Sequence, residues 1–325
     1  MAQLRVGLAG AGGVGARHAS TIGGLPDVRL VGVTDVDAGR ARALADQQDA
    51  EVFPDLEALL TSGRLDALWL CLPPFAHGEP ERAVLESGLP FFVEKPLAAD
   101  LATAERIAES VADKQIVTAT GYHWRAMAGV GRAAEILADH PVRLAHASWW
   151  DKVPPVSWWL RRDGSGGQIV EQATHLVDLL RLLVGEPVWV AAHASCDPDR
   201  DPSLVDTATA AMLRFDAGAV GTLSSTCLLR RKQAASLSLI GEGVFVEVRE
   251  ADTLISLGDT VEVMADEGVS KERVDAEFCQ AVRSGDPGAV RVPYAEALRT
   301  HRVGDAVDRS VRAGAPVELG ARVDG

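Results

Sequence analysis

Hydrophobic and polar positions follow two different rhythms along this chain of 325 residues. Up to residue 120, short apolar runs alternate with longer stretches in which apolar residues recur every three or four positions. The first pattern is typical of buried strands and the second of amphipathic helices. Their alternation predicts a doubly wound parallel sheet that is covered by helices on both faces. The expected strands are 4–9, 28–34, 65–72, 89–93 and 116–120, and the expected helices are 13–23, 38–48, 77–87 and 101–114.

The second half of the chain has shorter strands that are joined by tight turns. Three successive hairpins carry the turn sequences DAG, GEG and GD, which predict an antiparallel sheet. The expected elements are strands 142–150 and 189–196, a helix over 168–184, hairpins from residue 206 and helices from residue 271. We therefore predict a parallel-sheet domain over 1–121 and an α+β domain with a large, mostly antiparallel open sheet over 122–325.

Composition narrows the class of protein. Hydrophobic residues make up 47% of the chain, which is enough for a sizeable core. The 32 basic and 46 acidic residues give a formal net charge of -14, and this balance disfavours nucleic acid and anionic membranes as partners. The four cysteines form no CxxC pair, so free thiols in a reducing compartment are expected. With no signal-peptide pattern and no apolar run of roughly 18 residues, we expect a soluble, cytoplasmic protein.

The first expected strand ends in a glycine-rich loop, GLAGAGGVGARHA. Gly10, Gly12 and Gly15 fit the pattern G-x-G-x-x-G, in which the glycines allow a tight turn, a close approach of a pyrophosphate and close packing of the next helix. Gly13 and Val14 lie at the start of that helix, whose N–H groups and dipole favour phosphate. The loop therefore predicts a dinucleotide site.

Asp35 supports the same interpretation. It ends the second expected strand, 35 − 15 = 20 residues after the last glycine, where a carboxylate accepts hydrogen bonds from the ribose hydroxyls of NAD. A carboxylate would also repel the 2′-phosphate of NADP, although Arg40 follows close by. We predict NAD rather than NADP. The alternative, which does not exclude the first, is that Asp35 caps the next helix.

The apolar strand FFV runs directly into Glu94, Lys95 and Pro96. Ligands of open parallel sheets bind outside the carboxyl ends of the strands, so this strand is expected to end beside the cofactor. Proline fixes its own φ and favours an extended conformation for Lys95. A lysine held there can hydrogen-bond and polarise a substrate oxygen. The alternative is an ordinary Glu–Lys pair at a strand end.

From end to end, the chain resembles the GFO/IDH/MocA family of NAD(P)-dependent oxidoreductases, which is named for glucose–fructose oxidoreductase and inositol dehydrogenase. The resemblance implies that Lys95 is catalytic and contacts substrate, and that the Lys95–Pro96 peptide bond is cis. It also implies cofactor contacts for Pro73, His77 and Glu94. The matching segments are the glycine loop, Asp35, CLPPFAH (71–77), VEKPLA (93–98), GYHWR (121–125), SGGQIVEQATHLVDLLRLLVGEP (165–187), AEFCQAVRSGDP (276–287) and YAEALRTHRVGDAVDRSVRAGAPV (294–317).

The helix expected over 168–184 carries Glu171, His175 and Asp178 at i, i+4 and i+7, so one face would present all three. His175 is suited to accept a hydroxyl proton. The resemblance implies an Asp–x–x–x–His pair here, with histidine as acid/base, but this chain has Glu171 where aspartate is common. Whether Glu171 orients His175, binds a substrate hydroxyl or does both stays open. A metal on this face is the weaker alternative, because it offers few nitrogen ligands.

Tryptophans cluster before this helix, in WWDKVPPVSWWLRRDGSGG. Aromatic rings pack on the C–H faces of sugars, so Trp150 and Trp158 are candidate substrate contacts; a core or subunit-contact role is equally open. Arg161 and Arg162 leave open a phosphorylated or carboxylated substrate. The resemblance places two further residues near substrate, Tyr122 and Arg125.

The prediction is an oxidoreductase that moves a hydride between NAD and a secondary alcohol of a sugar, inositol or related polyol. Lys95 would polarise the reacting oxygen, and His175, aided by Glu171, would take the proton. Alternatives are an NAD-retaining glycosidase of the same family and a non-catalytic NAD- or sugar-binding protein. The resemblance also implies a homodimer or homotetramer that forms through the free face of the antiparallel sheet.

Overall fold

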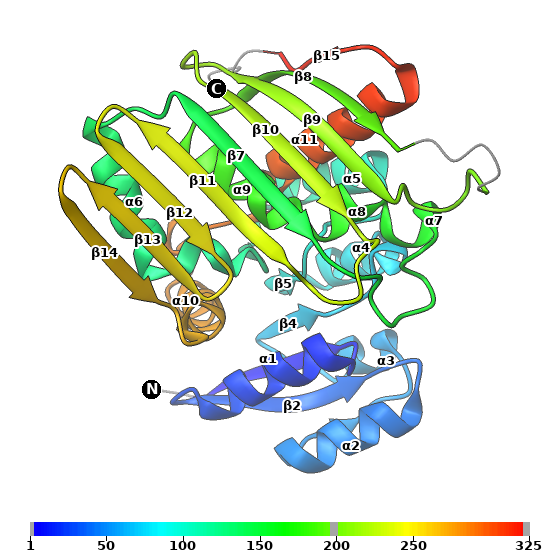
Figure 1. The fold of residues 1–325 in the computed structure, drawn as a ribbon. Helices are drawn as coiled ribbons and strands as arrows, with labels where there is room; N and C mark the ends of the chain where they lie inside the picture. Colours follow the sequence, from blue (N-terminus) through cyan, green and yellow to red (C-terminus); the bar gives the residue numbers. More distant parts are fainter. Residues whose placement is uncertain (1–2, 196–200, 321–325) are drawn as a thin grey trace. The chain divides into compact units, whose positions relative to one another are not determined.

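The structure is a computed structural model that describes residues 3–195 and 201–320. It divides into two compact units, each with its own sheet (Figure 1). Unit 1 consists of the described residues of Met1–Ala98, Ala102–His123 and Lys271–Leu298, and unit 2 consists of those of Ala99–Leu101, Trp124–Ser270 and Arg299–Gly325. The segment 271–298 thus belongs to unit 1, although it lies far beyond residue 121 in the sequence.

Unit 1 contains a six-stranded parallel sheet in the order β3-β2-β1-β4-β5-β6. This confirms the predicted doubly wound sheet. The strands are β1 (Leu4–Ala9), β2 (Val28–Thr34), β3 (Glu51–Val52), β4 (Ala67–Leu70), β5 (Phe91–Val93) and β6 (Thr118–Thr120). The helices are α1 (Gly13–Gly24), α2 (Ala38–Gln48), α3 (Leu56–Thr61), α4 (Glu79–Ser87), α5 (Leu101–Lys114) and most of α10 (Val269–Ser284).

The central strands of unit 1 are apolar because both of their faces are covered. Every residue of β4 and β5 is buried, and Trp69 and Phe92 are fully inaccessible. Aromatic rings fill the space under α10, where Phe278 lies edge-on to Trp69 with ring centroids 4.9 Å apart. The short elements β3 and α3 were not predicted, since two and six residues leave no readable period.

Unit 2 contains a nine-stranded sheet in the order β14-β13-β12-β11-β7-β10-β9-β8-β15. The three predicted hairpins are confirmed as the antiparallel pairs β9–β10, β11–β12 and β13–β14. The strands are β7 (Leu144–Trp150), β8 (Pro187–Ala194), β9 (Ala208–Phe215), β10 (Val220–Thr226), β11 (Ala234–Gly241), β12 (Val244–Arg249), β13 (Asp252–Leu257), β14 (Thr260–Ala265) and β15 (Val317–Glu318). The predicted strand over 189–196 extends to Cys196, which lies outside the described residues.

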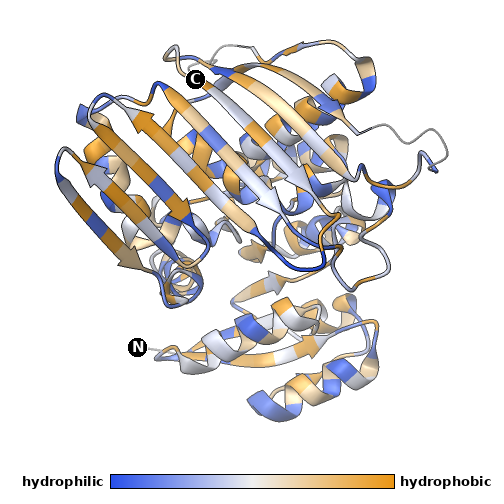
Figure 2. Ribbon diagram, viewed as in Figure 1, coloured by the Kyte–Doolittle hydropathy of each residue, from blue (hydrophilic) through white to orange (hydrophobic). Residues whose placement is uncertain are grey.

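One face of this sheet is covered by helices, which lie behind it in Figure 1. The helices of unit 2 are α6 (Ala128–Asp139), α7 (Arg162–Ser165), α8 (Gln168–Glu171), α9 (Thr174–Leu183) and most of α11 (Tyr294–Ala313). Side chains alternate between the core and the other face, as the burial of successive residues in β9 and β11 shows. Hydrophobic and hydrophilic residues follow one another along the strands of this sheet in Figure 2. The uncovered face carries exposed apolar side chains among polar ones. They include Leu144, Trp150, Met212, Val220 and Ile240.

The prediction of a single helix over 168–184 is wrong, because the helix is interrupted after Glu171. The N–H groups of Gln172 and Ala173 both donate to the carbonyl of Gln168, and the second bond spans five residues. One residue is therefore inserted into the helical turn, as in a π-type turn. Glu171 and His175 consequently belong to different helices, and the predicted common face is lost.

None of the helices within residues 3–195 and 201–320 is long and apolar enough to cross a membrane.

Candidate active site

The glycine loop lies at the carboxyl end of β1 and has the close contacts that its sequence predicts. Gly10 has a φ of +97°, and a Cβ there would overlap the carbonyl oxygen of Cys71. A Cβ at Gly15 would overlap the carbonyl oxygen of Gly10. Only glycine fits at either position, because one needs a positive φ and the other brings α1 against the loop.

The loop fits a dinucleotide pyrophosphate. A Cβ at Gly12 or Gly13 would meet nothing within 4 Å, so the backbone is open to a ligand on that side. Gly12 also supplies no side-chain cap to α1, which leaves the first N–H groups of the helix to phosphate oxygens. Val14, in the first turn, is exposed.

Asp35 follows β2 at the neighbouring strand end. Its Oδ2 accepts from Ala11 N at 2.6 Å, and its Oδ1 accepts from Asp37 N at 2.7 Å and from the Arg40 guanidinium at 2.9 Å. Burial raises the pKa of Asp35, but these donors outweigh it and the net pKa is lowered. The capping alternative for Asp35 is wrong, because α2 is capped by Asp37, which accepts from the N–H groups of residues 39 and 40.

Lys95 follows β5 at the same carboxyl edge of the sheet. Since β4 alone separates β1 from β5, Lys95 lies two strands, or about 10 Å, from the glycine loop strand. The Lys95–Pro96 peptide bond is cis, which confirms the expectation from resemblance. Lys95 is half-buried, whereas Glu94 is 6% exposed. The side chain of Glu94 turns inward and accepts from the backbone N–H of Lys95 at 3.1 Å.

Glu94 is held by cations within unit 1. His18 Nε2 lies 2.8 Å and Arg17 Nη2 lies 3.1 Å from the same carboxylate oxygen. Burial raises the pKa of Glu94, but the hydrogen bond and charge of His18, followed by Arg17 and Lys95, lower it to about 2. These contacts give Glu94 a role within the protein, and the predicted contact with cofactor stays a prediction.

Pro73 and His77 flank a short 3-10 helix, Pro74–Ala76, after β4. His77 Nδ1 lies 2.5 Å from Glu81 Oε1, and Glu81 Oε2 accepts from Gly78 N at 2.6 Å, so the dyad fixes the start of α4. His77 Nε2 is buried and has no hydrogen-bond partner among the residues that the structure describes. Tyr122, also in unit 1, is 1% exposed.

In unit 2, His175 lies in the first turn of α9 and is 6% exposed. Its ring is nearly parallel to those of Trp124 and Trp149, with centroid distances of 5.7 Å and 6.2 Å. Lys232 Nζ lies 4.8 Å from the Trp149 ring centroid. Two flat rings therefore fix the plane of the imidazole.

Glu171, in α8, contacts a tryptophan of the preceding segment. Its Oε2 accepts from Trp159 Nε1 at 2.6 Å, and Trp159 is fully buried with Val205 and Cys227. Because the helix is interrupted after Glu171, Glu171 and His175 lie on different helices.

Arg125 and Asp178, both predicted to bind substrate, bind each other. Arg125 Nε and Nη2 each donate to one Asp178 oxygen at 2.7 Å, and Thr300 Oγ1 donates to Asp178 Oδ1 at 2.8 Å. Asp178 is 1% exposed, and its burial raises its pKa despite these partners. The pair ties the segment after Trp124 to the helix that carries His175.

The structure also places Trp150 and Trp158, the two candidate substrate contacts of the tryptophan-rich segment. Trp150 is on the uncovered face of the sheet, where its Nε1 donates to Ser224 Oγ at 3.0 Å; its neighbour Trp149 faces His175 instead. Side chains of consecutive strand residues point to opposite faces, so only one of the two can contact His175. Trp158 packs against the buried cluster of Trp159.

The two arginines of the same segment are paired with aspartates. Arg161 makes two 2.9 Å bonds to Asp163, while Arg162 bonds Asp206 at 2.6 Å and Asp308 at 2.9 Å. Neither therefore offers an unpaired guanidinium to an anionic substrate.

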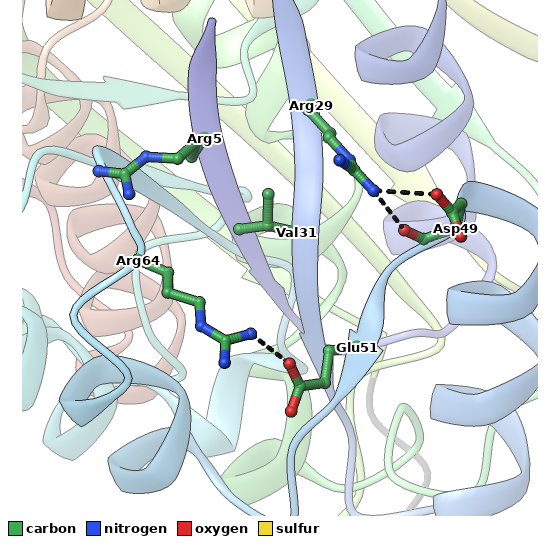
Figure 3. Close-up of a pocket in the computed structure, with 6 residues that line it drawn as sticks. All are labelled: Arg5, Arg29, Val31, Asp49, Glu51 and Arg64. Carbon is green, nitrogen blue, oxygen red and sulfur yellow. Dashed lines mark hydrogen bonds and ion pairs between the residues drawn. The ribbon is translucent and has the colours of Figure 1, made fainter.

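A separate hollow of about 250 Å³ lies at the amino ends of β1 and β2 (Figure 3). Two of its three arginines point toward carboxylates in Figure 3: Arg29 bonds Asp49 at 2.9 Å and Arg64 pairs with Glu51. Arg5 bonds Asp66 at 2.9 Å. Because ligands of such sheets bind at the carboxyl ends of the strands, this hollow is not the dinucleotide site. No group of three or more His, Cys, Asp or Glu side chains suited to a metal is found within residues 3–195 and 201–320.

Comparison with known proteins identifies the family. Residues 4–122 match the family described as "Oxidoreductase family, NAD-binding Rossmann fold", and residues 140–246 match the "GFO/IDH/MocA C-terminal domain". Unit 1 therefore carries the NAD-binding Rossmann fold of an oxidoreductase. The chain belongs to the GFO/IDH/MocA family, as its sequence motifs predicted.

Several characterised proteins are similar to this chain. Myo-inositol 2-dehydrogenase of Thermotoga maritima is 27% identical over 231 residues, which cover 69% of this chain and 68% of that protein. D-xylose 1-dehydrogenase (NADP(+)) 2 of Haloferax volcanii is 27% identical over 329 residues, 97% of this chain and 100% of that one. The structure of levoglucosan dehydrogenase in complex with NADH and levoglucosan shares the fold, with a TM-score of 0.89 at 20% identity, 98% of this chain and 100% of that one being covered.

Proposed function

We propose that this protein oxidises a secondary alcohol of a sugar, inositol or related polyol and transfers the hydride to NAD. Residues 1–121 would bind the dinucleotide and residues 122–325 the substrate. The observation that carries the proposal is the open backbone at Gly12 and Gly13 beside Asp35, which fits a dinucleotide. The names of the inositol and xylose dehydrogenases that this chain resembles support a polyol as substrate.

Lys95 is the proposed residue of unit 1 that donates a hydrogen bond to the reacting oxygen. It is half-buried at the carboxyl edge of the Rossmann sheet, and its backbone is fixed by Glu94. Donation to the oxygen favours the alkoxide as the C–H bond breaks and the hydride leaves. NAD, when bound, supplies the carbon that accepts this hydride.

His175 is the proposed base of unit 2. A secondary alcohol that loses a hydride must also lose its hydroxyl proton, and His175 would accept it. The stacking of the imidazole on Trp124 and Trp149 supports this role, because a base must be held in one orientation. The rings also suit a sugar with apolar C–H faces.

NAD is the proposed cofactor, in preference to NADP. The carboxylate of Asp35 is only 6% exposed and is held by two backbone N–H groups, so it stays ionised at the ribose end of the site. Its charge would repel a 2′-phosphate. Arg40, which is half-exposed, partly offsets this charge.

The test is absorbance at the reduced-nicotinamide band with a panel of inositols, sugars and anhydrosugars, run separately with NAD and NADP. Reduction of NAD by one polyol is expected. Lys95→Met should abolish the signal, and Lys114→Met, which changes an exposed lysine at the end of α5, should not. Binding of NAD without reduction by any polyol would overturn the dehydrogenase and favour the glycosidase or binding-protein alternatives.

We further propose that the uncovered face of the nine-stranded sheet joins copies of this chain in a homodimer or homotetramer. Exposed Trp150, Met212 and Ile240 among polar neighbours are typical of an interface rather than of a free surface. Met212→Asp should shift the mass measured by light scattering from oligomer towards monomer. A monomeric wild-type protein would contradict the proposal.

A further inference from the structure

We propose that His18 is a positioning residue for Lys95: as an imidazolium it bridges Asp275 and Glu94, and Glu94 in turn holds the backbone of Lys95. The inference rests on the function proposed above for Lys95, but its geometry lies wholly within unit 1. His18 is on α1, the helix that begins at the glycine loop, so one helix would serve both the dinucleotide and the lysine.

The hydrogen bonds of His18 indicate its charge. Nδ1 lies 2.7 Å from Asp275 Oδ1, and Nε2 lies 2.8 Å from Glu94 Oε1. An ionised carboxylate can only accept hydrogen bonds, and a neutral imidazole has a single N–H. Both contacts are satisfied together only by an imidazolium between two carboxylates.

All three side chains of the bridge are buried, so an unpaired charge among them would be costly. His18 and Asp275 are each 1% exposed, and Glu94 is 6% exposed. Two buried carboxylates without a cation between them would carry a large desolvation cost. Burial alone lowers the pKa of His18, but Asp275 and Glu94 outweigh it and raise the pKa to about 9.

The bridge is built from four separate parts of unit 1, which packing locks together. Trp69 Nε1 on β4 donates to the same Asp275 oxygen at 2.9 Å, and the Phe92 ring on β5 lies 5.0 Å from the His18 ring. A Cβ at Gly121 would come within 2.5–2.7 Å of the three carboxyl atoms of Glu94. The carboxylate therefore has little room to move, and the Lys95 N–H that donates to it is confined as well.

Other charged and titratable groups surround the bridge. Arg17 Nη2 lies 3.1 Å from both His18 Nε2 and Glu94 Oε1, so two cations converge on one carboxylate oxygen. His123 is kept neutral by burial, which lowers its pKa to about 4. The groups that act on the network electrostatically are Arg17, Cys71, Glu94, Lys95, His123, Lys271 and Asp275.

The first test is independent of any substrate. In the full chain with labelled histidine, nuclear magnetic resonance should show His18 with both ring N–H groups at pH 7.5, and this signal should titrate near pH 9. The variant His18→Gln assigns the signal by its loss.

A second readout is the rate at which an amine-reactive sulfonate labels Lys95, which mass spectrometry measures. His18→Gln should raise that rate by about fivefold or more, because the backbone of Lys95 loses its charged anchor.

The matched control is Arg283→Gln. Arg283 also ties α10 to the rest of unit 1, through the carbonyls of Pro26 and Asp27, but it lies outside the bridge. It should leave Lys95 labelling unchanged. Equal effects of the two variants would mean that only the docking of α10 matters, and a His18 that titrates below pH 7 would also overturn the proposal.

Where a polyol substrate is found, the same variants separate positioning from structure. His18→Gln should lower kcat by about tenfold and leave the Kd of NAD, measured by calorimetry, within about twofold. The double variant His18→Gln with Glu94→Gln should be no slower than Glu94→Gln alone, because His18 acts only through Glu94. Additive losses in kcat would refute this route. If no polyol reacts, the proposed function fails while the resonance and labelling results still decide the role of His18.

Discussion

Glu94 in unit 1 and Asp178 in unit 2 are both buried carboxylates near a proposed catalytic residue. Glu94 is neutralised mainly by His18, and its pKa falls to about 2. Asp178 is neutralised by Arg125, yet burial raises its pKa above the ordinary value. Arginine stays charged at any accessible pH, whereas histidine does not. The two carboxylates should therefore respond differently to pH and to loss of a partner.

The largest expected effect belongs to the proposed chemistry of unit 2. His175→Ala should lower kcat by about 10²–10⁴-fold, because the hydroxyl proton loses its acceptor. The Kd of NAD, measured by calorimetry, should not change, since the dinucleotide residues are in unit 1. Turnover within a few-fold of wild type would remove His175 from the mechanism.

Breaking the buried pair of unit 2 should mainly affect stability. Asp178→Asn leaves the Arg125 guanidinium buried without its counter-charge, and this costs about 3–5 kcal/mol in the free energy of unfolding. Asp163→Asn is the matched control, because Arg161 and Asp163 form a similar two-bond pair at the surface, where water screens the charges and the loss should be much smaller. Urea unfolding of both variants measures the difference. Equal losses would show that burial does not distinguish the pairs.

His18, in unit 1, should make the free energy of unfolding depend on pH. His18 has a folded pKa of about 9 and an unfolded value of 6.5, so its stabilisation is complete below pH 6.5 and is lost as the pH rises through 9. The 2.5-unit difference corresponds to up to about 3 kcal/mol. The Tm gap between wild type and His18→Gln should therefore narrow from pH 6.5 to pH 9.5. A gap that is constant over this range would contradict the charged bridge.

Packing against Glu94 gives the smallest effect. Gly121→Ala places a methyl group against the carboxyl atoms of Glu94 and should cost about 1–3 kcal/mol by overpacking. Gly131→Ala is the control: it is exposed in the interior of α6, meets nothing within 4 Å, and should stabilise by about 0.5–1 kcal/mol. Thermal unfolding of the two variants should shift in opposite directions. A neutral Gly121→Ala would show that Glu94 can move.

The two units also differ in how far their sequence predicted them. The bounds of β1, β2, α2 and α5 agree with the prediction, because apolar runs and helical periods are local signals. The glycine loop was predictable for the same reason. The site of unit 2 was predicted less well, since Glu171 and His175 appeared to share a helical face that the inserted residue removes.

What could not be predicted depends on contacts between distant parts of the chain. β7 lies between β10 and β11 and runs parallel to β10, which no local pattern indicates. Which of Trp149 and Trp150 contacts His175 depends on which face of β7 the helices cover. His18 and Asp275 are 257 positions apart, so no local pattern in the sequence indicated their contact.

The most direct test of the central claim is the origin of the hydride. A polyol that carries deuterium on the carbinol carbon should convert NAD to NADH one mass unit heavier, and His175→Ala should slow this transfer. A heavy NADH formed in step with the ketone would establish the proposed reaction. Cleavage of a glycoside with no net NADH, or no transfer from any polyol while NAD remains bound, would contradict it.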